Sequence, residues 1–100
     1  MDWYVYIISN KAHTLYVGMT DDLPRRIYEH KTKRYTTSFT ARYTFDRCVY
    51  FEVLSSRRAA EKREAAIKGW LRKRKIALIQ EHNPNWNDLA PSWTESLRLQ

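Results

Sequence analysis

The sequence predicts a small α/β domain of the α+β kind, with a three-stranded antiparallel sheet flanked by helices in the order β-β-α-β-α-α. Runs of β-branched and aromatic residues, which favour strands, occur near residues 2–9, 14–19 and 48–54. Apolar residues follow a helical spacing near 22–33 and 57–82. The short polar connection between the first two runs indicates an antiparallel hairpin.

Tyrosines and a glycine occupy alternate positions of this hairpin. Side chains on a strand alternate between its two faces. Tyr4 and Tyr6 therefore share one face of the first strand, and Tyr16 and Gly18 share one face of the second. Whether these two faces coincide depends on the strand register, which the sequence does not determine.

The first helix carries two charged or titratable residues on its packed side. Asp21 and Asp22 are best interpreted as helix caps, with Pro24 in the first turn. Arg26 and His30 fall on the apolar stripe of this helix, where a merely solubilising charge would not be placed. The stripe consists of Leu23, Arg26, Ile27 and His30. This placement is the first indication of a functional site.

A carboxylate falls on the apolar stripe of the second helical region. Ala60, Ile67 and Leu71 mark the stripe that we expect to be buried, and Glu64 lies on it. A carboxylate at such a position needs a partner, a metal ion or a raised pKa. The alternative is an ordinary helical pair of Glu64 with Lys68, worth only about 0.3–0.5 kcal/mol.

Composition limits the class of protein. We expect one domain over residues 1–90 and a loosely held tail over 91–100. The hydrophobic fraction of 43% excludes a disordered basic tail. No apolar run reaches membrane-spanning length, no Cys/His cluster has zinc spacing, and Cys48 is best interpreted as a buried inert thiol. These features predict a soluble cytoplasmic protein.

A net charge of +7 indicates a polyanionic partner. The aromatic residues Tyr35, Phe39 and Tyr43 lie among basic residues, which favours stacking on single-stranded or distorted nucleic acid. The alternative for the basic helical region is an ordinary solvated face. The expected nucleic-acid contacts are Lys33, Arg34, Arg42, Arg57, Lys62, Lys68, Arg72 and Lys73.

An ordered set of motifs resembles the GIY-YIG nuclease family, and in particular its small stand-alone bacterial members. Three departures stand out: the first motif lacks its glycine and keeps only its tyrosine, as Tyr6, Met19 replaces the lysine of the repair-nuclease branch, and His30 replaces a tyrosine of some branches. The matching residues are Tyr4-Val5-Tyr6-Ile7, Leu15 to Thr20, Asp22-Leu23, Arg26, His30, Val49 to Glu52, Ala59, Glu64, Ile67-Lys68, Arg72, Asn83-Pro84, Trp86 and Asp88-Leu89.

The resemblance implies the chemistry of a divalent-metal-dependent phosphodiesterase. Glu64 would bind one Mg²⁺ or Mn²⁺, and Arg26 would neutralise charge on the phosphate. A tyrosine, Tyr16 with Tyr6 beside it, would take the proton of the attacking water. His30 would hold that tyrosine's proton or act as the base itself, and the sequence leaves both roles open. Gly18 and Asn83 would be structural residues near the site.

Each of these residues has a plainer interpretation. Tyr6 and Tyr16 are common residues in a strand core, and Arg26 with His30 is compatible with an exposed helical pair. Asn83 before a proline is equally typical of a helix stop. The remaining histidines, His13 and His82, are expected to face solvent or cap a helix.

The resulting functional prediction is an endonuclease of low sequence specificity, active in DNA repair, recombination or processing. The expected partner is single-stranded, branched or damaged DNA in preference to plain duplex, with RNA left open. A protein partner for targeting, and a monomer or weak dimer, are compatible with the sequence, and no membrane association is expected. The alternatives are a non-catalytic nucleic-acid-binding module of the same fold and, less favoured, a basic membrane-surface protein.

Overall fold

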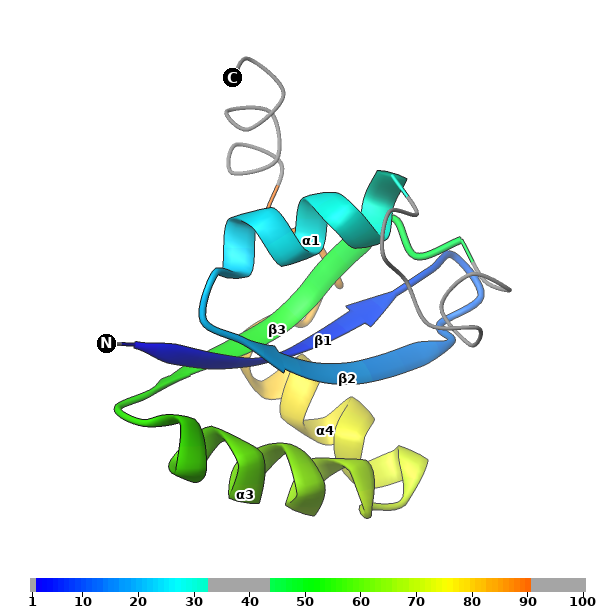
Figure 1. Ribbon diagram of the computed structural model, residues 1–100. Helices are drawn as coiled ribbons and strands as arrows, with labels where there is room; N and C mark the ends of the chain where they lie inside the picture. Colours follow the sequence, from blue (N-terminus) through cyan, green and yellow to red (C-terminus); the bar gives the residue numbers. More distant parts are fainter. Residues whose placement is uncertain (1, 33–43, 91–100) are drawn as a thin grey trace.

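A three-stranded antiparallel sheet forms the centre of the protein. The computed structural model describes residues 2–32 and 44–90. Strands β1 (Trp3–Ser9), β2 (Leu15–Thr20) and β3 (Arg47–Leu54) lie in the order β2-β1-β3, so the first strand is the central one (Figure 1). Every strand end lies within one residue of its predicted position.

Helices cover both faces of the sheet. Helix α1 (Leu23–Thr32) lies on one face, and α3 (Arg57–Lys68) and α4 (Arg72–His82) lie on the other (Figure 1). The predicted α+β fold and its element order are therefore confirmed. Within the described part of the chain, no helix is long and apolar enough to cross a membrane.

The second helical region is divided between Gly69 and Leu71. Ser56 begins α3 by accepting the amide of Ala59 at 3.1 Å, and Gly69 forms the C-cap. Ile67 is fully buried, as predicted, but Leu71 is 82% exposed. The prediction of a buried Leu71 is wrong because the helix ends at Lys68, so the stripe does not continue to the next turn.

The two faces of the sheet have separate cores, as the alternation of side chains requires. Val5 and Ile7 point to the α3–α4 side, where they pack with Ile67 and Ile79. The α1-side core consists of Tyr6, Ile8, Leu23, Ile27, Phe45, Cys48 and Ala90. Both faces of the sheet thus bury aliphatic and aromatic side chains, with Tyr50 and Trp86 in the core on the α3–α4 side and Tyr6 and Phe45 in the core on the α1 side.

The segment after α4 is fastened to β3 by Asn83. Its side-chain amide donates to the carbonyls of Val49 at 3.0 Å and Asn87 at 2.9 Å, and its oxygen accepts the amide of Asn87 at 3.1 Å. Trp86 is buried, and its ring stacks on His13 at 3.9 Å between centroids. His13 is exposed as expected, but the sequence did not indicate this stacking.

Asp88 completes the attachment. It accepts the amides of Cys48 and Ala90 and forms an ion pair with Lys31, so it joins β3, the C-terminal segment and the end of α1. Cys48 itself is fully buried, and burial raises its pKa to about 12. The thiol therefore stays protonated and packs as an apolar side chain, as predicted.

Gly18 provides the space that a neighbouring side chain fills. A Cβ built on Gly18 would lie 2.4 Å from the hydroxyl oxygen of Tyr6, whereas one on Gly69 would come no closer than 3.5 Å to any atom. We expect Gly18→Ala to lower the free energy of unfolding by about 1–3 kcal/mol, since the buried Tyr6 ring would have to move. Urea unfolding measures this loss.

Gly69→Ala is the matched control. Gly69 has φ −79° and ψ −10°, which alanine adopts freely, so its replacement should change stability by less than about 1 kcal/mol. Equal losses in the two variants would contradict the role that we assign to the space above Gly18.

Candidate active site

The strand register brings the two tyrosine faces together. Tyr6 of β1 lies opposite Gly18 of β2, and Ile8 lies opposite Tyr16, so Tyr6, Tyr16 and Gly18 share the face that α1 covers. The ring of Tyr6 extends across Gly18, and its hydroxyl lies 2.9 Å from Nε2 of His30. The absence of a side chain at Gly18 is therefore what lets Tyr6 reach α1.

His30 is buried on α1 with only 3% of its surface exposed. Burial, and secondarily the positive charge of Arg26, lowers its pKa to about 4, so the imidazole is neutral near pH 7. It lies between the two tyrosines: its ring centroid is 5.7 Å from that of Tyr6 and 5.5 Å from that of Tyr16. Nε2 of His30 forms its hydrogen bond with Tyr6, one of the two tyrosines that the sequence placed at the site.

Arg26 supplies the positive charge of this group. Its guanidinium donates to Oε1 of Glu29 at 3.1 Å and lies close enough to Tyr6 for the two groups to perturb each other's pKa. Burial acts to lower the pKa of Arg26, but Tyr6 and Glu29 outweigh it and raise the pKa above its ordinary value. The side chain is 22% exposed, so a charged guanidinium is held partly buried beside Tyr6.

The charge of Arg26 bears on the direction of the Tyr6 hydroxyl. A cation beside Tyr6 favours the Tyr6 oxygen as an acceptor toward it, which leaves the hydroxyl hydrogen for Nε2 of His30. His30 then carries its own hydrogen on Nδ1, which has no hydrogen-bond partner in the described part of the chain. Burial is the main cause that raises the pKa of Tyr6. Tyr6 is therefore a hydrogen-bond donor and a poor base.

Glu64 lies on the opposite side of the sheet from α1 and is connected to Tyr16 through Lys68. It projects from α3, and its carboxylate lies 3.6 Å from Nζ of Lys68, one helical turn away. The Lys68 ammonium in turn lies 5.6 Å from the centre of the Tyr16 ring. Because β2 is an edge strand, Lys68 can reach Tyr16 around the edge of the sheet. The sequence did not reveal this contact, since only the tertiary packing of α3 against β2 produces it.

The donor set around Glu64 fits a hard divalent cation. The side chain is 22% exposed, and its 3.6 Å contact with Lys68 is longer than a hydrogen bond, so its oxygens can accept further partners. Residues 2–32 and 44–90 hold no group of three or more His, Cys, Asp or Glu side chains suited to a metal. A single carboxylate suits Mg²⁺, which keeps several water ligands and binds substrate phosphate.

The predicted nucleic-acid contacts fall into two groups. Lys62, Lys68, Arg72 and Lys73 are exposed on α3 and α4. Arg57 is exposed too, but it pairs with Glu61 at 3.0 Å and lies over the Trp3 ring. Lys33, Arg34 and Arg42, together with the aromatic residues Tyr35, Phe39 and Tyr43, lie outside the described residues.

Other basic residues of α3 and α4 have structural partners that the sequence did not reveal. Arg63 donates to both carboxylate oxygens of Glu52 on β3, the shorter bond being 2.6 Å. Arg74 lies over the Trp70 ring with 3.9 Å between the guanidinium carbon and the ring centre. These residues join the helices to one another or to the sheet, so their charges are not all available to a ligand.

Comparison with known proteins agrees with this architecture. The model of the GIY-YIG catalytic domain matches residues 2–77. A UPF0213 protein of Syntrophus aciditrophicus is 34% identical over 79 residues, which cover 79% of this chain and 91% of that protein. One from Haloquadratum walsbyi is 37% identical over 78 residues, or 78% of this chain and 86% of that protein.

A solved structure is similar as well. The solution NMR structure of a UPF0213 protein from Bacillus halodurans superposes with a TM-score of 0.55 at 30% identity, covering 86% of this chain and 90% of that one. By domain model, by sequence and by fold, the chain belongs to the GIY-YIG family and, within it, to the small stand-alone UPF0213 group.

Proposed function

We propose that this protein is a divalent-metal-dependent endonuclease that hydrolyses DNA phosphodiester bonds with little sequence specificity. Membership of the GIY-YIG catalytic domain family indicates a nuclease. The observation that carries the proposal is the hydrogen-bonded pair of Tyr6 and His30, with the charge of Arg26 and the ring of Tyr16 beside it. A core tyrosine would not require a neutral buried histidine and a partly buried arginine around its hydroxyl.

The proposed roles follow from charge and exposure. Arg26 would bind a non-bridging phosphate oxygen and stabilise the charge that develops in the transition state. A divalent cation held by Glu64 would polarise the phosphate and stabilise the leaving oxygen. Lys68 would add a positive charge beside Tyr16, on the side of the site where Met19 leaves the family's lysine absent.

The general base would be Tyr16. Tyr6 is 1% exposed and directs its hydrogen to His30, whereas Tyr16 is only partly buried and can be reached by water. Tyr6 and His30 would act instead as a rigid pair that positions Arg26 and the Tyr16 ring. This assignment selects one of the alternatives that the sequence left open.

A non-catalytic DNA-binding module is the second candidate. It is favoured by the contact of Glu64 with Lys68, which partly satisfies the only carboxylate that we assign to the metal. The two candidates differ in a direct measurement. Labelled single-stranded, duplex, flap and branched DNA, with an RNA strand in parallel, should be incubated with Mg²⁺, with Mn²⁺ and with EDTA. Metal-dependent cleavage supports the nuclease, and binding without cleavage under every condition supports the module.

Glu64→Gln should abolish cleavage and leave folding and DNA binding largely intact. Loss of a metal ligand removes several kcal/mol of transition-state stabilisation, which corresponds to roughly a thousandfold or more in rate. Single-turnover cleavage with Mg²⁺ measures this loss. Glu61→Gln, the same change at an exposed position of the same helix, is the control and should cleave normally. Near-normal turnover by Glu64→Gln would show that the metal assignment is wrong.

The neutral state of His30 should appear in the pH dependence of stability. The pKa is about 4 in the folded protein and about 6.5 in the unfolded chain, so the unfolded chain binds more protons between these values. The contribution of His30 is complete above about pH 6.5 and is lost as the pH falls toward 4, by up to about 3 kcal/mol.

Urea unfolding of the wild type and of His30→Gln between pH 7.5 and 4 isolates this contribution, because other titrating groups are common to both proteins. The difference in stability between the two should shrink as the pH falls. A difference that is constant over this range would mean that His30 is not held neutral by burial.

The exposed lysines make a prediction about binding that is independent of cleavage. If about four to six Lys or Arg residues contact phosphates, log K should fall with log salt at a slope of roughly −3 to −5. Charge reversal of Lys62 and Lys73 should make this slope less steep by roughly 1.5 or more. Lys11→Glu, a reversal in the β1–β2 connection, should leave it nearly unchanged. Fluorescence anisotropy at several salt concentrations in EDTA provides the slopes, and an unaltered slope in the double variant would place the DNA elsewhere.

A further inference from the structure

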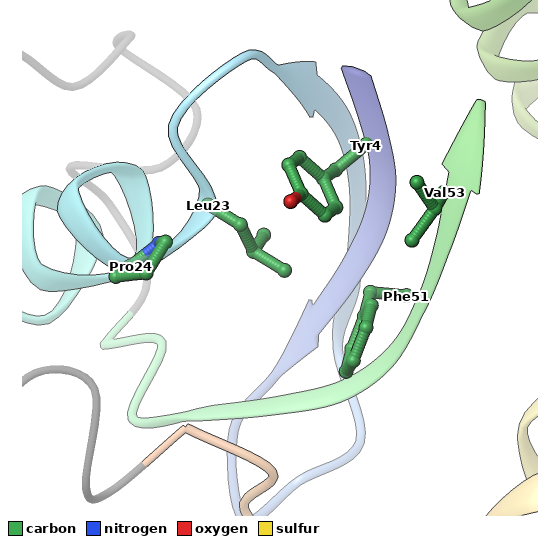
Figure 2. A pocket seen from close by; sticks show the side chains of 5 residues that line it. All are labelled: Tyr4, Leu23, Pro24, Phe51 and Val53. Atoms are coloured by element: carbon green, nitrogen blue, oxygen red, sulfur yellow. The ribbon is translucent and has the colours of Figure 1, made fainter. Parts of the chain in front are cut away.

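An apolar pocket opens beside the candidate active site. It has a volume of about 340 Å³, which is within the range of small-molecule sites. In Figure 2, Tyr4 of β1 and two residues of β3 face the beginning of α1 across the pocket. The lining residues are Tyr4, Leu23, Pro24, Phe51 and Val53.

The pocket is continuous with the face that carries Tyr6. Tyr4 precedes Tyr6 by two residues on β1, so both side chains project from the same face. Phe51 lies directly opposite Tyr6 on β3, and Leu23 packs in the same core cluster as Tyr6. A ligand that extends from Arg26 along β1 toward its N-terminal end would therefore meet the pocket next.

The chemistry of the lining selects a flat, uncharged group. Neither Tyr4 nor Phe51 is fully buried, and none of the five lining residues is charged. Val53 is 53% exposed, which is unusual for a large apolar residue of a strand and leaves one side of the pocket open. A planar group entering here would contact two aromatic side chains.

The rim adds positive charge at the α1 side. Arg25 and Arg26 follow the lining residue Pro24 directly. The Arg25 side chain is 56% exposed, and its nearest carboxylate, that of Asp22, lies 3.6 Å away and is itself 55% exposed, so the pair is weak. The site thus places an aromatic pocket next to cations, which is the combination that binds a base together with its phosphate.

We propose that this pocket binds an unpaired nucleobase of the substrate strand, beside the phosphate held at Arg26. The proposal rests on the nuclease function proposed above, and it specifies the substrate class. A paired base is stacked inside the duplex and cannot enter, so the pocket selects single strands, flaps and distorted duplexes. It also explains why tyrosine and phenylalanine remain partly exposed at this end of the sheet.

The test removes one base at a time. Single-stranded oligonucleotides, each with one abasic position moved stepwise along the strand, are bound to the wild type in EDTA, and affinity is measured by anisotropy. An oligonucleotide that binds in one register should show one position at which base removal weakens binding about fivefold to a hundredfold, since stacking contributes that much. Duplex DNA should show no comparable position.

Variants of the pocket test whether the base at the sensitive position of the oligonucleotide is the one that enters the pocket. Val53→Trp fills the pocket from an exposed strand position, and Tyr4→Leu removes one ring while keeping an apolar side chain. Both should bind the intact strand as weakly as the wild type binds the abasic one, and both should be insensitive to base removal. Leu71→Trp, the same indole at an exposed position beyond the opposite face, should behave as the wild type. Thermal unfolding verifies that each variant is folded.

Three results would overturn the proposal. The first is that the wild type binds every abasic oligonucleotide with equal affinity. The second is that both pocket variants are folded and still lose affinity at the same abasic position. The third is a concentration-dependent dimerisation that Val53→Trp abolishes, which would assign the pocket to a second copy of the chain. Cleavage with Mg²⁺ is scored separately. If the wild type does not cleave but its binding depends on one base position, the nuclease function is contradicted and the pocket proposal stands. If the wild type cleaves but its binding depends on no base position, only the pocket proposal is contradicted.

Discussion

The arrangement of the candidate site depends on the passage of the Tyr6 ring across Gly18 to His30. This contact joins the central strand, the edge strand and α1, because Tyr6 lies opposite Gly18 in the register and its hydroxyl meets His30 at 2.9 Å. A side chain at position 18 would occupy the place of the hydroxyl. The glycine is therefore required for space, and not for an unusual backbone conformation, since no glycine here has positive φ.

The electrostatics of the same contact explain how two basic residues can be packed side by side. Arg26 and His30 are one helical turn apart, and both are at least partly buried. Two cations at this distance would repel each other strongly in a medium of low dielectric constant. The repulsion is avoided because His30 loses its charge, and Arg26 keeps its own with the help of Glu29 and Tyr6.

Much of this architecture could be predicted from local sequence patterns. The strands, the Asp22 cap and the stripe with Arg26 and His30 follow from periodicity and capping, which are local properties. The register, the partner of His30 and the contact of Lys68 with Tyr16 could not, because they depend on how distant elements pack. The error at Leu71 has the opposite origin: a periodic pattern was extended through a glycine that ends the helix.

The position of Glu64 remained ambiguous in the sequence for a physical reason. A stripe residue can lie at the centre of a buried face or at its margin, and periodicity alone does not distinguish the two. The structure places Glu64 at the margin, where its side chain is 22% exposed and a lysine approaches it. A carboxylate at the margin keeps contact with solvent and with a lysine, so its partial burial alone is no evidence of function.

The assignment of Glu64 to the candidate site rests instead on the contacts that can form around the free edge of the sheet. The sheet separates α1 from α3, so groups on these helices can meet only around an edge. Strand β2 provides that edge, and Tyr16 on it has contacts in both directions, to the His30 ring and to the Lys68 ammonium. In the function proposed above, a phosphate at this edge would be bound by Arg26 from the α1 side and by the cation at Glu64 from the α3 side. We infer that Tyr16 links the two halves of the site, which is why the short edge strand carries it.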